Sequence, residues 1–135
     1  MNHSTLARRL AAVLATAALL GSAAQAATPA ELLAGYNAQA VMAASPQRGE
    51  QFFNATHGKE WSCTSCHGTT PTQAGKHAST GKAIGALAPS ANTQRFSDAA
   101  KVEKWFRRNC NDVLGRECSA AEKADVMSWL IGLKP

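Results

Sequence analysis

Residues 63–67 of the 135-residue chain read Cys63-Thr64-Ser65-Cys66-His67. Two cysteines three positions apart, followed directly by a histidine, form the C-x-x-C-H attachment motif of a c-type haem. The thiols form thioether bonds to the haem vinyl groups, and the histidine becomes the proximal iron ligand. The sequence therefore predicts one covalent haem c, bound by Cys63, Cys66 and His67.

Two other interpretations of the motif are a redox dithiol and half of a zinc site. Neither explains the histidine next to the second cysteine. The sequence contains no second C-x-x-C and no H-x-x-x-H that could complete a zinc site. We therefore prefer haem attachment.

Residues 1–26 have the composition of a cleaved secretory signal peptide. Arg8 and Arg9 precede an apolar run over residues 10–20, and Ala24-Gln25-Ala26 forms a small-residue cleavage site. The apolar run is too short to span a bilayer, so we expect no membrane insertion. Because haem is attached to c-type apoproteins after export, we expect residues 27–135 to be a single monohaem cytochrome c domain in the periplasm.

The formal net charge of the chain is +5, and loss of Arg8 and Arg9 with the signal peptide lowers it by two charges. Such a small positive net charge is not typical of a nucleic-acid-binding protein, and we expect no nucleic-acid binding. The apolar core is small for this length once the alanine-rich signal is excluded. A buried porphyrin would supply the missing hydrophobic surface.

Helix-capping residues predict an all-α fold of four to five helices around the haem. The expected helices run from Thr28 to about Ala43, from Ser45 to Asn54, from Ser97-Asp98 onward, and from Ser119 to near the C-terminus. Residues 68–95 are expected to form a loop, and no strand is predicted. Gly49 either marks close helix packing or lies on the surface by accident.

The helix after Asp98 carries an apolar stripe of Val102, Trp105 and Phe106. We assign Trp105 and Phe106 to haem contact. One further step of three residues reaches Asn109, which places an amide where the stripe predicts an apolar residue. Asn109 is either an iron ligand or a helix-end residue that hydrogen-bonds free carbonyls.

The sequence pattern alone does not identify the second axial ligand of the haem iron. No methionine occurs between Gly68 and Leu114, and Met42 and Met127 are expected in the core, so methionine ligation is disfavoured. The remaining donors besides Asn109 are His57, His77, Asn92, Asn111, Lys76 and Lys82.

Cys110 and Cys118 are not used by the haem motif. In an oxidising compartment, two such cysteines normally form a disulfide, although two buried free thiols are the alternative. The enclosed loop is short, so the loop-entropy model gives a gain of about 2–3 kcal/mol.

These motifs together resemble the sphaeroides haem protein family over most of the mature chain. The matching segments are Thr80-Gly81-Lys82, Leu87-Ala88-Pro89, Arg95-Phe96, Lys101-Val102-Glu103-Lys104-Trp105, Asn109-Cys110-Asn111 and Gly115-Arg116-Glu117-Cys118. The resemblance implies a class I-type cytochrome c in which an asparagine before the first disulfide cysteine binds ferric iron and leaves on reduction. The matching residue is Asn109; the related cytochrome c double-prime has histidine there.

The resemblance further implies oxygen binding and electron exchange with a multihaem cytochrome c. We expect a periplasmic electron carrier whose distal Asn109 leaves on reduction, so that ferrous haem can bind O₂, CO or NO. The alternatives are a plain electron carrier with fixed His67–His77 ligation, and a small haem oxygen or nitric oxide reductase or peroxidase. We expect a carrier rather than an enzyme, because no distal acid or base is seen beyond Asn109.

Four cations of the same helix, at positions 101, 104, 107 and 108, suit docking to an acidic partner. An ordinary solvated helix face explains them equally well.

Overall fold

The structure is a computed structural model that describes residues 26–135. Apart from Ala26, the predicted signal peptide lies outside the described residues. Within them the elements follow in the order α1 (Pro29–Gln39), α2 (Pro46–Asn54), α3 (Thr64–His67), β1 (Gly75–Lys76), β2 (Ala83–Ile84), α4 (Ala99–Leu114) and α5 (Ala120–Gly132). The prediction of four to five helices is confirmed.

Every predicted helix start is confirmed, because side chains near in sequence satisfy the free N–H groups of each first turn. The Thr28 hydroxyl accepts from the Glu31 N–H at 3.2 Å, and the Glu31 carboxylate accepts from the Thr28 N–H at 2.8 Å. Ser119 and Glu122 form the same reciprocal capping box on α5. Ser45 caps α2, and Asp98 rather than Ser97 caps α4.

Helix α1 ends at Gln39, four residues before the predicted end. Ala40 is already extended, with φ −86° and ψ 148°, and the Asn37 side chain accepts from the Ala44 N–H at 3.0 Å. This side-chain bond closes a turn in place of another helical turn. Met42 lies in that turn and is 53% exposed, so its predicted place in the core is wrong.

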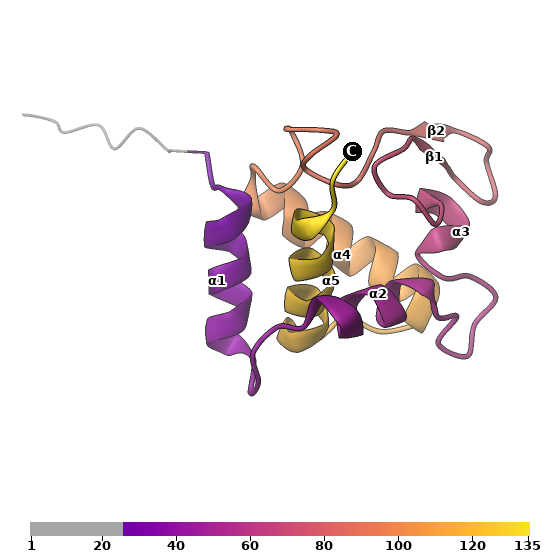
Figure 1. The fold of residues 1–135 in the computed structure, drawn as a ribbon. Helices are drawn as coiled ribbons and strands as arrows, with labels where there is room; N and C mark the ends of the chain where they lie inside the picture. The colour runs from indigo at the N-terminus through magenta and orange to yellow at the C-terminus, as the bar shows by residue number, and fades with distance from the viewer. Residues whose placement is uncertain (1–25) are drawn as a thin grey trace, which may run out of the picture.

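Helix α2 crosses α5, while α1 runs alongside α5 (Figure 1). At the crossing, a Cβ on Gly49 would collide with the backbone carbonyl of Asp125. The Phe53 and Trp129 rings pack 5.0 Å apart. The close-packing interpretation of Gly49 is therefore confirmed, and Phe53 is the fully buried aromatic residue of α2.

The hydrophobic core is built around α5, where Met127 is fully buried as predicted. An ion pair ties the start of α2 to the same helix. The guanidinium of Arg48 donates from Nε and Nη2 to both oxygens of Asp125, each at 2.8 Å, and the Ser45 N–H donates to Asp125 at 2.7 Å. The charge of the buried carboxylate is thereby compensated.

A small hairpin lies within the segment that was predicted to be all loop. Strands β1 and β2 pair antiparallel, with Gly75 opposite Ile84 and Lys76 opposite Ala83. The prediction of no strand is wrong here, because two residues per strand are too few for an alternating pattern to be visible. The hairpin and α3 lie at the end of the molecule away from α1 (Figure 1).

Helix α4 is connected to α1 and α5 by side chains. The Tyr36 hydroxyl donates to Glu103 at 2.5 Å, and Lys123 pairs with the same carboxylate at 2.8 Å. The Tyr36 and Phe106 rings meet edge to face at 5.9 Å. Among residues 26–135, no helix is both long and apolar enough to cross a membrane.

Candidate haem site

Helix α3 carries the C-x-x-C-H motif and begins with a cluster of hydroxyl groups. The buried Ser62 donates its N–H to the Ser65 hydroxyl at 3.0 Å, and its own hydroxyl contacts that of Thr64 at 2.5 Å. The N–H groups of Cys66 and His67 both donate to the Cys63 carbonyl, at 3.3 and 3.0 Å. This single helical turn places the two cysteines on one face, as double thioether attachment requires.

The hairpin packs directly on α3. A Cβ on Gly75 would collide with the Cys66 carbonyl and with the Cα of His67. The Ala78 N–H also donates to the Cys66 sulfur at 3.3 Å. Because β1 approaches the backbone of the motif this closely, the hairpin fixes the position of α3.

His67 lies against the core, with its ring centroid 6.1 Å from that of Phe53. Burial, and next the positive charge of Arg95, lower the pKa of His67 to about 4. The imidazole is therefore neutral at physiological pH, which is the form that binds metals. Its ring makes no hydrogen bond to any of residues 26–135, so neither nitrogen is engaged by another side chain of the described chain.

Cys63 and Cys66 are both reduced and only partly buried. Burial raises the pKa of the Cys63 thiol to about 11. A redox dithiol needs the opposite shift, because its attacking cysteine is activated by a lowered pKa. The electrostatics of Cys63 therefore disfavour the dithiol interpretation.

On α4, the apolar stripe is only partly buried. Val102 is buried and Phe106 packs against the core, but Trp105 is 41% exposed and carries the guanidinium of Arg108 5.6 Å from its ring. Residues 26–135 therefore do not bury Trp105, and only Val102 and Phe106 of the stripe pack against the protein core. Contact of Trp105 and Phe106 with haem stays a prediction.

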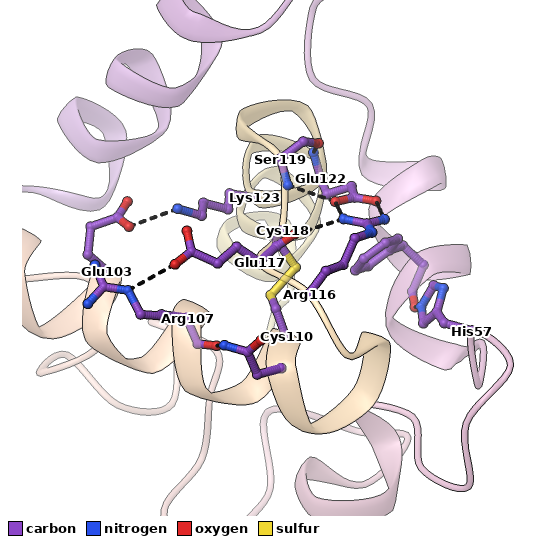
Figure 2. Close-up of a disulfide and its surroundings, with 12 residues drawn as sticks. His57, Glu103, Arg107, Cys110, Arg116, Glu117, Cys118, Ser119, Glu122 and Lys123 are labelled. Carbon is purple, nitrogen blue, oxygen red and sulfur yellow. Dashed lines mark hydrogen bonds and ion pairs between the residues drawn. A yellow bond between two sulfur atoms is a disulfide. The ribbon is translucent and has the colours of Figure 1, made fainter.

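Asn109 lies one turn beyond Phe106, is partly buried, and directly precedes Cys110. Cys110 and Cys118 form the expected disulfide, with their Cα atoms 5.6 Å apart (Figure 2). Figure 2 also shows the ion pairs that flank it, Lys123–Glu103, Arg107–Glu117 and Arg116–Glu122. The disulfide thus joins the end of α4 to the segment that precedes α5, and the Lys123–Glu103 pair links the start of α5 to the first half of α4.

The other donors considered from sequence have different environments. The His57 ring contacts the Phe52 carbonyl through Nε2 at 2.7 Å, and its centroid lies 4.3 Å from that of the Phe52 ring, with the planes tilted by 45°. The His77 Nδ1 accepts from the Thr80 N–H at 3.3 Å within the hairpin turn. The amides of Asn92 and Asn111 bond backbone carbonyls, and Lys76 and Lys82 are exposed.

The described residues suit covalent haem c. The motif supplies two unpaired thiols on one helical face and a neutral, unengaged imidazole, which is the donor set that such a haem requires.

Two residues of the site were missed by sequence reasoning. Gly75 gives no sequence signal, because its role depends on a contact with α3 that folding creates. Arg95 was noted only as part of the family resemblance, although its charge reaches His67. No local sequence feature marks Arg95, since Lys76 and Lys82 likewise have no carboxylate within two residues.

Comparison with known proteins identifies the relatives of the chain. Residues 39–130 match the family described as "Domain of unknown function (DUF1924)". Cytochrome c-type protein SHP of Cereibacter sphaeroides is 50% identical over 125 residues, covering 90% of this chain and 93% of that protein. Cytochrome c'' of Methylophilus methylotrophus is 47% identical over 87 residues, covering 62% of this chain and 60% of that protein.

Solved structures agree with these sequence relationships. The structure of oxidized SHP, described as an oxygen binding cytochrome c, has a TM-score of 0.76 at 49% identity and covers 80% of this chain and 99% of that chain. The crystal structure of oxidized cytochrome c'' has a TM-score of 0.69 at 39% identity and covers 79% of this chain and 95% of that chain. The predicted all-α cytochrome fold, covalent haem c and family resemblance are confirmed, and the chain belongs to the DUF1924 family of c-type cytochromes that are related to SHP and cytochrome c''.

Proposed function

We propose that this c-type cytochrome is exported to the periplasm, carries single electrons, and uses Asn109 as an exchangeable distal ligand opposite His67. Reduction of the bound haem would release Asn109, and the site could then accept O₂, CO or NO. The oxygen binding that is stated for SHP supports this proposal through the 49% identity between the two chains.

The observation that carries the proposal is the free amide of Asn109. Asn92 donates to the Ala86 carbonyl at 3.1 Å, and Asn111 donates to the Arg107 carbonyl at 2.8 Å. Asn111 thus makes the helix-end bond that was the alternative explanation for Asn109. The amide of Asn109, partly buried one turn from Phe106, makes no hydrogen bond to any of residues 26–135. A partly buried amide without a partner is suited to ligate.

Haem c would be held by Cys63, Cys66 and His67 and would supply a one-electron iron couple. His67 is suited to be the permanent ligand, because its imidazole stays neutral and its helix is covalently attached. The amide oxygen of Asn109 is a hard, weak, neutral donor, which suits Fe(III) better than the softer Fe(II). Once released, the amide nitrogen of Asn109 still has two N–H groups with which to donate a hydrogen bond to a gas ligand.

The attachment of α4 limits how Asn109 moves. The Cys110–Cys118 disulfide and the Lys123–Glu103 ion pair hold α4 on either side of position 109. A shift of the whole helix would strain these links. Release of the ligand is therefore expected to be a rotation of the Asn109 side chain about its own χ angles.

Electron exchange requires a protein partner, and we propose a multihaem cytochrome c with an acidic docking face. The exposed cations of α4 are complementary to such a face; they are Lys101, Lys104, Arg107 and Arg108. Because these charges are exposed, the association rate with the partner should fall as ionic strength rises.

The test is Asn109→Ala, with Asn111→Ala as the matched control on the same helix. Haem attachment should be unaffected, because Cys63, Cys66 and His67 are unchanged. The ferric optical spectrum of Asn109→Ala should shift toward a high-spin or water-ligated form, while Asn111→Ala should keep the parent spectrum. After dithionite reduction, both variants should bind CO. A parental ferric spectrum in Asn109→Ala would mean that another residue holds the iron, and His77 would then be substituted next.

A further inference from the structure

Arg95 is a half-buried cation without a carboxylate partner. All nine acidic residues of the sequence lie within residues 26–135, and the four ion pairs among these residues use other cations. Burial lowers the pKa of Arg95, which reports the cost of removing its charge from water. Because a guanidinium stays protonated in proteins, this cost is reduced by hydrogen-bond acceptors around it and most strongly by an anion.

The guanidinium is held in one orientation. Its Nε donates to the Ala86 carbonyl at 2.8 Å, and its Nη2 donates to the Gly85 carbonyl at 2.7 Å. The next residue, Phe96, is buried in the core and has a left-handed φ of 56°, which fixes the backbone beside Arg95. Two of the five N–H groups of a guanidinium are used by these carbonyls, so three remain to bind an anion.

The segment that holds Arg95 lies on the His67 side of the site. Leu87 and Ala88, which follow the two carbonyls, both donate their N–H groups to the Pro71 carbonyl, at 2.8 and 3.0 Å. Pro71 comes four residues after His67 in the chain. These two hydrogen bonds tie the segment that positions Arg95 to the loop that directly follows His67.

We propose that Arg95 binds a carboxylate of haem c through its remaining N–H groups and thereby orients the porphyrin on His67 and favours the ferrous state. A planar guanidinium with parallel donors matches a carboxylate in geometry and charge. The proposal rests on haem attachment at Cys63 and Cys66, and does not depend on whether Asn109 is the exchangeable ligand.

The first test measures the haem reduction potential of Arg95→Gln, with Arg116→Gln as the control. Both changes remove one positive charge, but Arg116 is exposed and pairs with Glu122. Loss of the cation beside the haem should lower the ratio of reduced to oxidised protein on the order of tenfold at fixed ambient potential, equivalent to about 59 mV for one electron. Arg116→Gln should change this ratio less than about twofold.

The pH dependence separates binding of a carboxylate from a purely structural role. Without its cation, the haem carboxylate should have a raised pKa, so the potential of Arg95→Gln should rise toward that of the parent as the pH falls. Arg95→Lys keeps the charge and should keep most of the potential. A folded Arg95→Gln protein with the parental potential at every pH would overturn the proposal and leave Arg95 as a residue that only holds the 85–86 carbonyls.

A second measurement needs no variant. In the isotope-labelled parent holoprotein, the guanidinium protons of Arg95 should show nuclear Overhauser effects to the propionate methylene protons of the haem. Effects to Gly85 and Ala86 alone, with none to the haem, would equally overturn the proposal.

Discussion

Gly49→Ala adds one methyl group at the crossing of α2 and α5. Its Cβ would overlap the carbonyl oxygen and carbon of Asp125 and meet the amide nitrogen of Val126. All three are backbone atoms of α5, so no side-chain rotation relieves the contact. The helices must separate at the position where the Phe53 and Trp129 rings pack 5.0 Å apart.

The size of the effect follows from two opposing contributions. Overpacking a well-packed site costs about 1–3 kcal/mol, and a contact with rigid backbone belongs at the upper end, about 3 kcal/mol. Replacing a helical glycine by alanine returns about 1 kcal/mol. We therefore expect Gly49→Ala to lose about 2 kcal/mol of unfolding free energy, which lowers Tm by roughly 10 °C at this chain length.

Gly35→Ala on α1 is the matched control, because no atom lies within 4 Å of the Cβ built there. Both variants gain the same helix propensity, so the difference between them isolates the packing cost. Urea unfolding of the ferric holoproteins should separate them by about 3 kcal/mol at an unchanged m value. Equal stability of the two variants would refute the close packing of Gly49 against the backbone of α5.

Two further predictions concern the hairpin and acid stability. Gly75→Ala should separate β1 from α3, which lowers the unfolding free energy by about 1–3 kcal/mol and speeds amide exchange at residues 75–84. Gly132→Ala is the control, because nothing lies near its Cβ, and it should cause none of these changes. Unchanged amide exchange in Gly75→Ala would count against the contact between β1 and α3. Hydrogen bonding to Arg116, then to Ser119, lowers the pKa of Glu122 in the folded state. The ionised Glu122 therefore stabilises the fold fully above its pKa in the unfolded chain, about 4.3, and this stabilisation is lost as the pH falls through the lower pKa of the folded state. We expect the unfolding free energy, measured in urea between pH 3 and 6, to vary less with pH in Glu122→Gln than in the parent. The difference should be under about 1 kcal/mol, because Arg116 is largely exposed. A variant with the pH profile of the parent would contradict this prediction.

The parts of the fold that were predictable from sequence are those encoded locally. A capping box needs only residues three apart, so Thr28 with Glu31 and Ser119 with Glu122 mark their helix starts without any knowledge of the tertiary structure. The C-x-x-C-H motif is also local, since a single helical turn contains both cysteines and the proximal histidine.

The parts that were missed depend on contacts distant in sequence. The hairpin strands have two residues each and gain their position from the backbone of α3, so no periodic pattern marks them. The pairing of Arg48 with Asp125 spans 77 positions and could not be inferred from either residue. Met42 was placed in the core on its apolar character alone, but the Asn37 side chain ends α1 before it and leaves it in an exposed turn.

The two sides of the candidate site are held by different means, and this difference bears on the proposed exchange of ligand. Around His67 the support is dense, since the ring of Phe53, the β1 backbone and the charge of Arg95 all lie close. Asn109 is held through its helix, and its amide makes no hydrogen bond to any of residues 26–135. A ligand switch needs one fixed ligand and one that leaves at low cost, and this contrast in support is what the proposed roles of His67 and Asn109 require.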